Sequence, residues 1–191
     1  MKPLILASAS PRRAELLQQI GLTFEVCAAD IDETPQACEL PRDYVLRMAK
    51  EKALAIAPRF PQAVVIASDT SVVVDGTVLG KPVDAEDASR MLQLLSGRSH
   101  QVMTSVCVYS AEYTDLVVNE TDVWFKPLSA AEIEAYWRSG EPVDKAGAYA
   151  IQGLGAMFVE RIDGSYSGVM GLPLFDVARM LHDAGVIESI A

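Results

Sequence analysis

Two adjacent arginines stand at the start of an expected helix, within the stretch SASPRR at residues 8–13. Ser10 suits the N-cap, and Pro11 suits the first helical position, where a missing N–H costs nothing. The helix dipole disfavours cations at this end, whereas hydroxyls and arginines beside free N–H groups suit a bound anion. The candidate phosphate ligands are Ser8, Ser10, Arg12 and Arg13. The alternative is a pair of solvated arginines on a surface helix.

A lysine lies on the apolar face of a second expected helix, over residues 41–57. At about 100° per residue, this face contains Tyr44, Val45, Met48, Ala49, Ala55 and Ile56. Lys52 projects from its middle. Its stem could be buried with the amine reaching water, or the amine could meet a negative partner in a cleft. Both interpretations stay open at this point.

The polar stretch SDTS at residues 68–71 separates two very apolar runs, 64–67 and 72–74. Ser, Asp and Thr favour turns, but a chain reversal already follows at Asp75-Gly76. We therefore expect Asp69 at the end of a strand that opens onto a site. A carboxylate there could act as a metal ligand or as a general base.

Three loop features are weaker candidates. Lys81 lies in a Gly-Lys-Pro turn, and Asp32 and Glu33 form an acidic run; both patterns are typical of solvated loops. The segment 144–155 contains three glycines, which would let the backbone approach a ligand closely. Its spacing is not that of a P-loop, and a flexible loop is the alternative.

These residues must be positioned by helices and strands. Along the chain, strand-like runs alternate with helical runs. We expect strands at residues 4–7, 22–28, 63–67, 99–110, 115–125 and 157–162, and a hairpin at 72–79. We expect helices starting at Pro11 and covering 41–57, 84–95, 129–139 and 174–184, with Ser129 and Glu132 as a capping box. The pattern predicts an α/β fold with a partly antiparallel sheet.

Composition narrows the function classes. The 191 residues suit one domain or two small lobes around a cleft. A net charge of −10 argues against a broad nucleic-acid surface but leaves room for a small basic pocket. No apolar run is long enough to span a membrane. Three scattered cysteines predict neither disulfides nor a zinc site and favour a cytoplasmic location.

Six stretches together are familiar: LASASPRRAELL, VLRMAKEKA, ASDTSVVVDGTVLGKP, LLSGRSHQVMTSV, DKAGAYAIQGLG and GSYSGVMGLPL. Through them the sequence resembles the Maf family of nucleoside triphosphate pyrophosphatases from residue 4 to about residue 175. The resemblance implies an α/β fold like that of Maf and inosine triphosphate pyrophosphatases. That fold has a long mixed sheet, flanking helices and a cleft between two lobes, here a single domain over residues 1–191.

The resemblance also implies hydrolysis of a nucleoside triphosphate to the monophosphate and pyrophosphate, with Mg²⁺ or Mn²⁺. The form DKAGAYAIQG resembles the branch that acts on dTTP and UTP, a house-cleaning role against non-standard pyrimidine nucleotides. The implied partner is a small nucleotide, with neither nucleic acid nor membrane, and relatives are commonly homodimers. The alternative is a nucleotide-binding regulator of cell division and septum formation with little turnover.

Roles for single residues follow from the matched motifs. Phosphate-facing positions correspond to Ser8, Ser10, Arg12, Arg13, Lys52 and Lys81, acidic positions to Glu33 and Asp69, and base-choice positions to Arg12, Thr70 and Gln152. Our hypothesis is that Asp69, with Glu33, holds the metal and orients a water toward the α-phosphate. Gln152 would pair with the carbonyl and N3–H edge of uracil or thymine.

Overall fold

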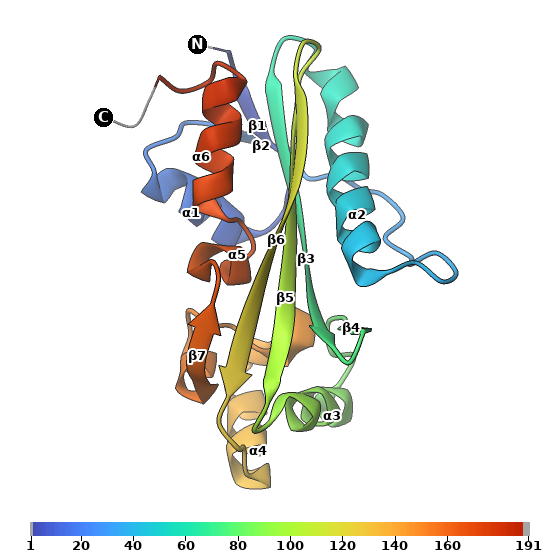
Figure 1. Cartoon of the computed structure of the whole chain (residues 1–191), viewed down its shortest axis with the longest axis vertical. Coiled ribbons are helices and arrows are strands. Elements are labelled where there is room, and N and C mark those ends of the chain that lie inside the picture. Colours follow the sequence, from blue (N-terminus) through green and yellow to red (C-terminus); the bar gives the residue numbers. More distant parts are fainter. Residues whose placement is uncertain (1, 189–191) are drawn as a thin grey trace.

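Seven strands form one mixed sheet in the computed structural model, which describes residues 2–188 (Figure 1). They are β1 (Leu4–Leu6), β2 (Glu25–Val26), β3 (Val64–Val74), β4 (Thr77–Leu79), β5 (Ser99–Tyr109), β6 (Thr114–Phe125) and β7 (Val159–Asp163). The order is β2-β1-β3-β5-β6-β7, with β4 paired to β3. β1 pairs in parallel with β2 and β3, and the other pairings are antiparallel. The predicted mixed α/β class is confirmed.

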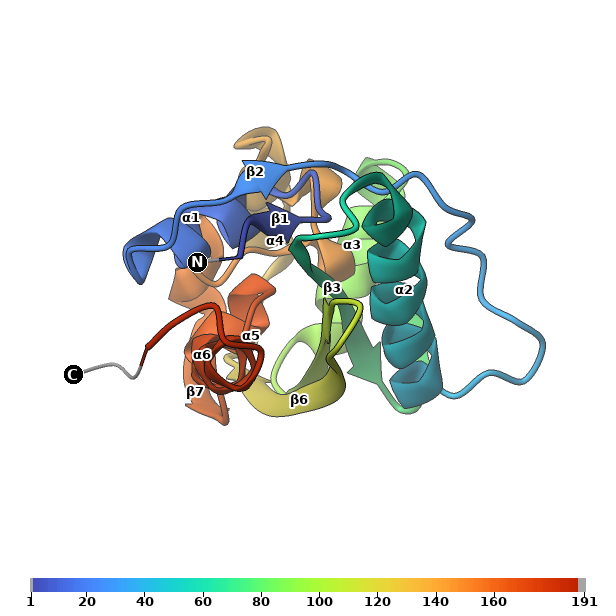
Figure 2. The ribbon, with the colours of Figure 1, turned by 90° about the horizontal axis from the view of Figure 1, so that it is seen from above.

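Helices cover both faces of the sheet. They are α1 (Pro11–Gln19), α2 (Pro41–Ile56), α3 (Ala85–Leu95), α4 (Ala130–Arg138), α5 (Tyr166–Met170) and α6 (Leu174–Asp183). Figures 1 and 2 show α2 on one face and α1, α5 and α6 on the other, with α3 and α4 at one end of the long strands. Within residues 2–188, no helix is long and apolar enough to cross a membrane.

Local signals set most element boundaries as predicted. The Asp75-Gly76 turn has positive φ at both residues (50° and 74°), as a tight hairpin between β3 and β4 requires. Ser129 and Glu132 form the predicted capping box of α4. Asp84 caps α3 by accepting a hydrogen bond of 2.8 Å from the Asp87 N–H.

The side chains of β3 point alternately toward the two helical layers that cover the sheet. Val65 and Ala67 pack in the apolar cluster that contains α2, whereas Val64 and Ile66 pack in the cluster that contains α1 and α6. Because successive side chains of a strand point to opposite faces, Asp69 faces α2 and its neighbours face the other layer. A single strand therefore brings groups from both layers to one place.

Two expectations were wrong in detail, and one helix was not expected. The strand predicted over residues 22–28 is reduced to Glu25–Val26, two exposed residues that pair only with the short β1. On α2 the buried alanine near the C-terminal end is Ala53, while Ala55 is exposed. The five-residue α5 was not anticipated, since its sequence is too short to show a helical period.

Candidate active site

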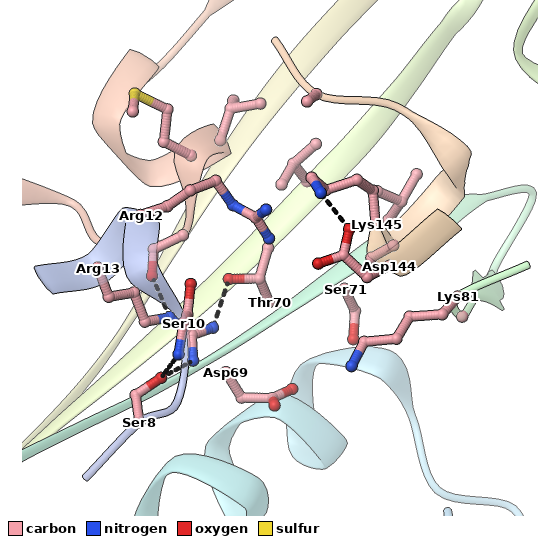
Figure 3. A pocket seen from close by; sticks show the side chains of 18 of the residues that line it. Ser8, Ser10, Arg12, Arg13, Asp69, Thr70, Ser71, Lys81, Asp144 and Lys145 are labelled. Atoms are coloured by element: carbon pink, nitrogen blue, oxygen red, sulfur yellow. Dashed lines mark hydrogen bonds and ion pairs between the residues drawn. The ribbon is translucent and has the colours of Figure 1, made fainter. Parts of the chain in front are cut away.

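The ten residues that the matched motifs assign to the site line one cavity of about 590 Å³, whereas Asp32, the other residue of the acidic run, does not. They are Ser8, Ser10, Arg12, Arg13, Glu33, Lys52, Asp69, Thr70, Lys81 and Gln152. They come from the start of α1, the acidic loop, α2, the middle of β3, the turn after β4 and the Gly-rich segment. Figure 3 shows those at the start of α1, in β3 and in the turn after β4.

A buried ion pair joins α2 to β3. Lys52 Nζ lies 2.8 Å from Asp69 Oδ1 and 3.1 Å from Glu33 Oε1. The side chains of Lys52 and Asp69 are each 9% exposed, whereas that of Glu33 is 53% exposed. Lys52 is therefore not a snorkelling lysine: its amine meets carboxylates at the cavity wall. Tyr44 supports the acidic loop by donating a hydrogen bond of 2.9 Å to the Glu33 carbonyl.

Asp69 is not at a strand end, as the sequence suggested, because β3 runs unbroken through residues 68–71. Antiparallel pairing with β5 satisfies this backbone, with Asp69 opposite Ser105. The polar side chains find partners across the layers: Ser68 donates to the Gly171 carbonyl at 2.9 Å, and Lys52 binds Asp69. The polar interruption is thus a strand interior whose side chains serve a cavity.

Arg13 is fixed by three hydrogen bonds. Its guanidinium donates to the Gly171 carbonyl (2.9 Å), Ser8 Oγ (3.1 Å) and Thr70 Oγ1 (3.2 Å). Burial lowers the pKa of Arg13 from its ordinary value, while the charge of Asp69 opposes this shift. Arg13 therefore ties α1, β3 and the end of α5 together at the cavity wall.

Arg12 and Lys81 differ from Arg13, since neither side chain makes a hydrogen bond or ion pair with any of residues 2–188. In Figure 3 their side chains extend into the pocket from opposite sides. The side chain of Ser10 does not cap α1; instead its N–H donates to Ser8 Oγ at 3.2 Å. The first-turn N–H groups of α1 consequently stay available to a ligand.

Comparison with known proteins decides the family. The family model described as "Maf-like protein" matches residues 3–184. The chain belongs to the Maf family. A dTTP/UTP pyrophosphatase of Vibrio parahaemolyticus is 57% identical over 181 residues, covering 94% of this chain and 96% of that protein. One of Shewanella oneidensis is 56% identical over 192 residues, covering 96% and 99%. Among solved structures, a Staphylococcus aureus Ham1 protein aligns with a TM-score of 0.43 and 16% identity, covering 65% of this chain and 72% of that one.

Two charged residues of the Maf cavity were quoted in the sequence but given no role. Asp144 and Lys145 form an ion pair at the cavity wall. With them the lining contains five cationic side chains and three carboxylates, a local net charge of +2 in a chain of −10. Their position directly before the Gly-rich segment was the signal that could have identified them.

A divalent cation fits this Maf site only with help from the substrate. Among residues 2–188 no group of three or more Asp, Glu, His or Cys side chains could hold a metal ion. Asp69 and Glu33 share Lys52 and both line the cavity. Mg²⁺ is commonly bound by one or two carboxylates together with substrate phosphates and water, so this donor set fits a cation brought by a triphosphate.

Proposed function

We propose that this Maf protein hydrolyses dTTP and UTP to the nucleoside monophosphate and pyrophosphate. One observation carries the proposal: a cavity in an acidic protein sets unpaired cations against a lysine-linked pair of carboxylates. A triphosphate needs such cations, and hydrolysis needs a carboxylate that can orient water. The dTTP/UTP pyrophosphatases more than 50% identical to this chain support the choice of substrate.

The unpaired cations bind the triphosphate in this proposal. Arg12 and Lys81 approach the phosphates from two sides, and the free N–H groups at the start of α1 add neutral donors. Ser8 and Ser10 add hydroxyls, while Arg13 keeps this wall in place through its three hydrogen bonds. Because these groups are already oriented, they can stabilise charge that develops on the phosphoryl oxygens.

Asp69 orients the attacking water. The water oxygen forms a bond to the α-phosphorus, the bond to the bridging α–β oxygen breaks, and its electron pair leaves with pyrophosphate. The water proton passes to the Asp69 carboxylate and then to solvent. Lys52 holds Asp69 Oδ1 at 2.8 Å and so fixes the direction of the carboxylate. Asp69 and Glu33 would also hold the divalent cation, which neutralises charge on the phosphates when bound.

Gln152 selects the base. Its side chain is exposed, lines the cavity and makes no hydrogen bond with residues 2–188, so its amide is free to pair with a base. An amide offers one donor face and one acceptor, which match the N3–H and carbonyl edge of uracil and thymine. Cytosine presents the reverse pattern, an N3 acceptor beside an N4–H₂ donor, so the amide pairs with it only after turning by 180°, and selection requires the orientation of the amide to be fixed. The site accepts both uracil and thymine because an extra methyl changes binding by only about 1–3 kcal/mol.

A substrate panel tests this function. The purified chain is incubated with dTTP, UTP, CTP, ATP and GTP in the presence of Mg²⁺, and pyrophosphate is measured. We expect release from dTTP and UTP well above release from the other nucleotides. Hydrolysis in ¹⁸O-water should place the label in UMP, as attack at the α-phosphorus requires. Tight nucleotide binding without pyrophosphate release would favour the regulator of septum formation instead. A cytoplasmic location and a homodimer stay predictions.

A further inference from the structure

A pair of side chains outside the cavity holds the turn that carries Gln152. Glu141 Oε2 accepts a hydrogen bond from the Leu154 N–H (2.9 Å), and Glu141 Oε1 accepts one from the Gly155 N–H (3.0 Å). Tyr136 donates its hydroxyl to the same Oε1 (2.7 Å). The Tyr136 oxygen also accepts from the Ala150 N–H (3.0 Å). The two residues therefore bind both ends of the turn at residues 150–155.

The turn packs closely against this pair at two of its glycines. A Cβ added to Gly153 would lie 2.1 Å from Glu141 Oε2. A Cβ added to Gly155 would lie 2.8 Å from the Tyr136 hydroxyl and 2.7 Å from the Ala150 carbonyl oxygen. Such distances are far below van der Waals contact, so no larger residue fits without movement. At Gly155 the clash includes backbone, whereas at Gly153 it is with the Glu141 carboxylate alone, so a side chain at residue 153 would displace that carboxylate from the turn. Tyr136 and Glu141 are called the clamp below.

The clamp is itself anchored in the core. Tyr136 lies on α4, is 4% exposed and packs edge-on against Phe158 with ring centroids 4.9 Å apart. Gly140 follows α4 with φ of 76°, which turns the chain so that Glu141 returns toward the hydroxyl. Burial raises the pKa of Glu141, but hydrogen bonds from Gly155, Tyr136 and Leu154 outweigh it and lower the pKa overall. The carboxylate is thus suited to accept all three hydrogen bonds.

We propose that Tyr136 and Glu141 are positioning residues for base selection, acting through the turn at residues 150–155. This inference rests on the proposed function, in which Gln152 selects the base. The Gln152 side chain has no partner of its own among residues 2–188, so its place in the cavity depends on its backbone. A loosened turn lets the amide shift and accept the wrong base edge, which reduces discrimination without removing the phosphate-binding groups.

The test compares kcat/KM for UTP with kcat/KM for CTP in four single variants and one double variant. Tyr136→Phe removes the hydrogen bond donated to Glu141 and the one accepted from the Ala150 N–H but keeps the ring, and Glu141→Gln turns one acceptor oxygen into a donor. Glu132→Gln is the matched control, because Glu132 caps the other end of α4 and does not contact the turn. Gln152→Ala removes the proposed reader. Thermal unfolding is measured for every variant.

We expect Gln152→Ala to lower the UTP/CTP ratio about 10-fold, the effect of losing about one hydrogen bond to the base. Tyr136→Phe and Glu141→Gln should lower it about 3-fold or more, mainly through a higher KM for UTP. Glu132→Gln should leave the ratio unchanged even if it lowers the unfolding temperature. Tyr136→Phe added to Gln152→Ala should cause no further loss.

Each other outcome overturns the inference. If Gln152→Ala lowers the ratio but both clamp variants change UTP and CTP equally, the clamp does not position the base reader and the proposed function stands. If Glu132→Gln lowers the ratio as much as the clamp variants, the effect comes from α4 as a whole. If the unaltered protein hydrolyses neither nucleotide, the proposed function is wrong, and the inference that rests on it is wrong as well.

Discussion

Removing the amine of Lys52 should destabilise the fold and greatly reduce turnover, for two separate reasons. Lys52→Met keeps the length of the stem and removes the charge that lies 2.8 Å from Asp69 Oδ1. Since both side chains are 9% exposed, the variant leaves a buried carboxylate without its partner. Loss of one partner from such a pair costs about 3–5 kcal/mol. The Lys52–Glu33 pair adds at most about 1 kcal/mol, because Glu33 is mostly in water.

For a chain of this size, about 3 kcal/mol lowers the unfolding temperature by roughly 10 °C. The double variant Lys52→Met with Asp69→Asn removes both charges and should recover most of that loss. Pyrophosphate release from UTP should stay at least about 100-fold below that of the unaltered protein in both variants. The single variant lacks the amine that fixes the direction of the Asp69 carboxylate, and the double variant lacks the carboxylate itself. Thermal unfolding by circular dichroism and a pyrophosphate assay measure the two effects.

Two results would refute this reasoning. If the single variant unfolds within about 2 °C of the unaltered protein, the pair is not the buried contact described here. If the double variant is no more stable than the single one, the cost does not arise from a carboxylate left alone.

Three further predictions concern pH, the two arginines and the metal. Burial, aided by the charge of Arg98, lowers the pKa of His100 to about 4, so below about pH 6.5 only the unfolded state takes up this proton. Stability should therefore fall by up to about 3 kcal/mol between pH 6.5 and 4 in urea unfolding, and His100→Gln should flatten this slope. Arg12→Ala should raise the KM for UTP and leave the unfolding temperature unchanged. Arg13→Ala should raise the KM and also lower the unfolding temperature, because three hydrogen bonds are lost. Equal unfolding temperatures for the two variants would contradict their different roles. A chelator should stop pyrophosphate release without lowering the unfolding temperature, and a marked drop would reveal a structural metal site.

The elements could be predicted where the signal is local. The Asp75-Gly76 turn and the capping box at Ser129 depend on neighbouring residues, and both are present. The strand expected at residues 22–28 depended on pairing, and only Glu25–Val26 pairs with β1. The sequence of a strand does not show how many residues of a neighbouring strand are available to pair with it.

In the site, too, features that depend on local sequence could be predicted, whereas contacts between distant residues could not. Lys52 could be singled out because a charge on an apolar helix face is visible in the sequence, but its carboxylate partners are 17 and 19 residues away along the chain. The stretch at residues 68–71 suggested a strand end, because nothing local shows that β5 and α5 supply partners for polar side chains. Tyr136 and Glu141 left no signal, since their effect depends on contacts with a distant turn.

The most direct measurement is kcat for pyrophosphate release from UTP by Asp69→Asn, together with UTP affinity by calorimetry. The substitution keeps an oxygen that can accept from Lys52, and Glu33 still pairs with that amine, so the phosphate-binding groups stay in place while thermal unfolding reports the cost of the lost charge. We predict that kcat falls at least about 100-fold while UTP still binds. A kcat within about threefold of the unaltered protein would contradict the assignment of Asp69 as the group that orients the attacking water.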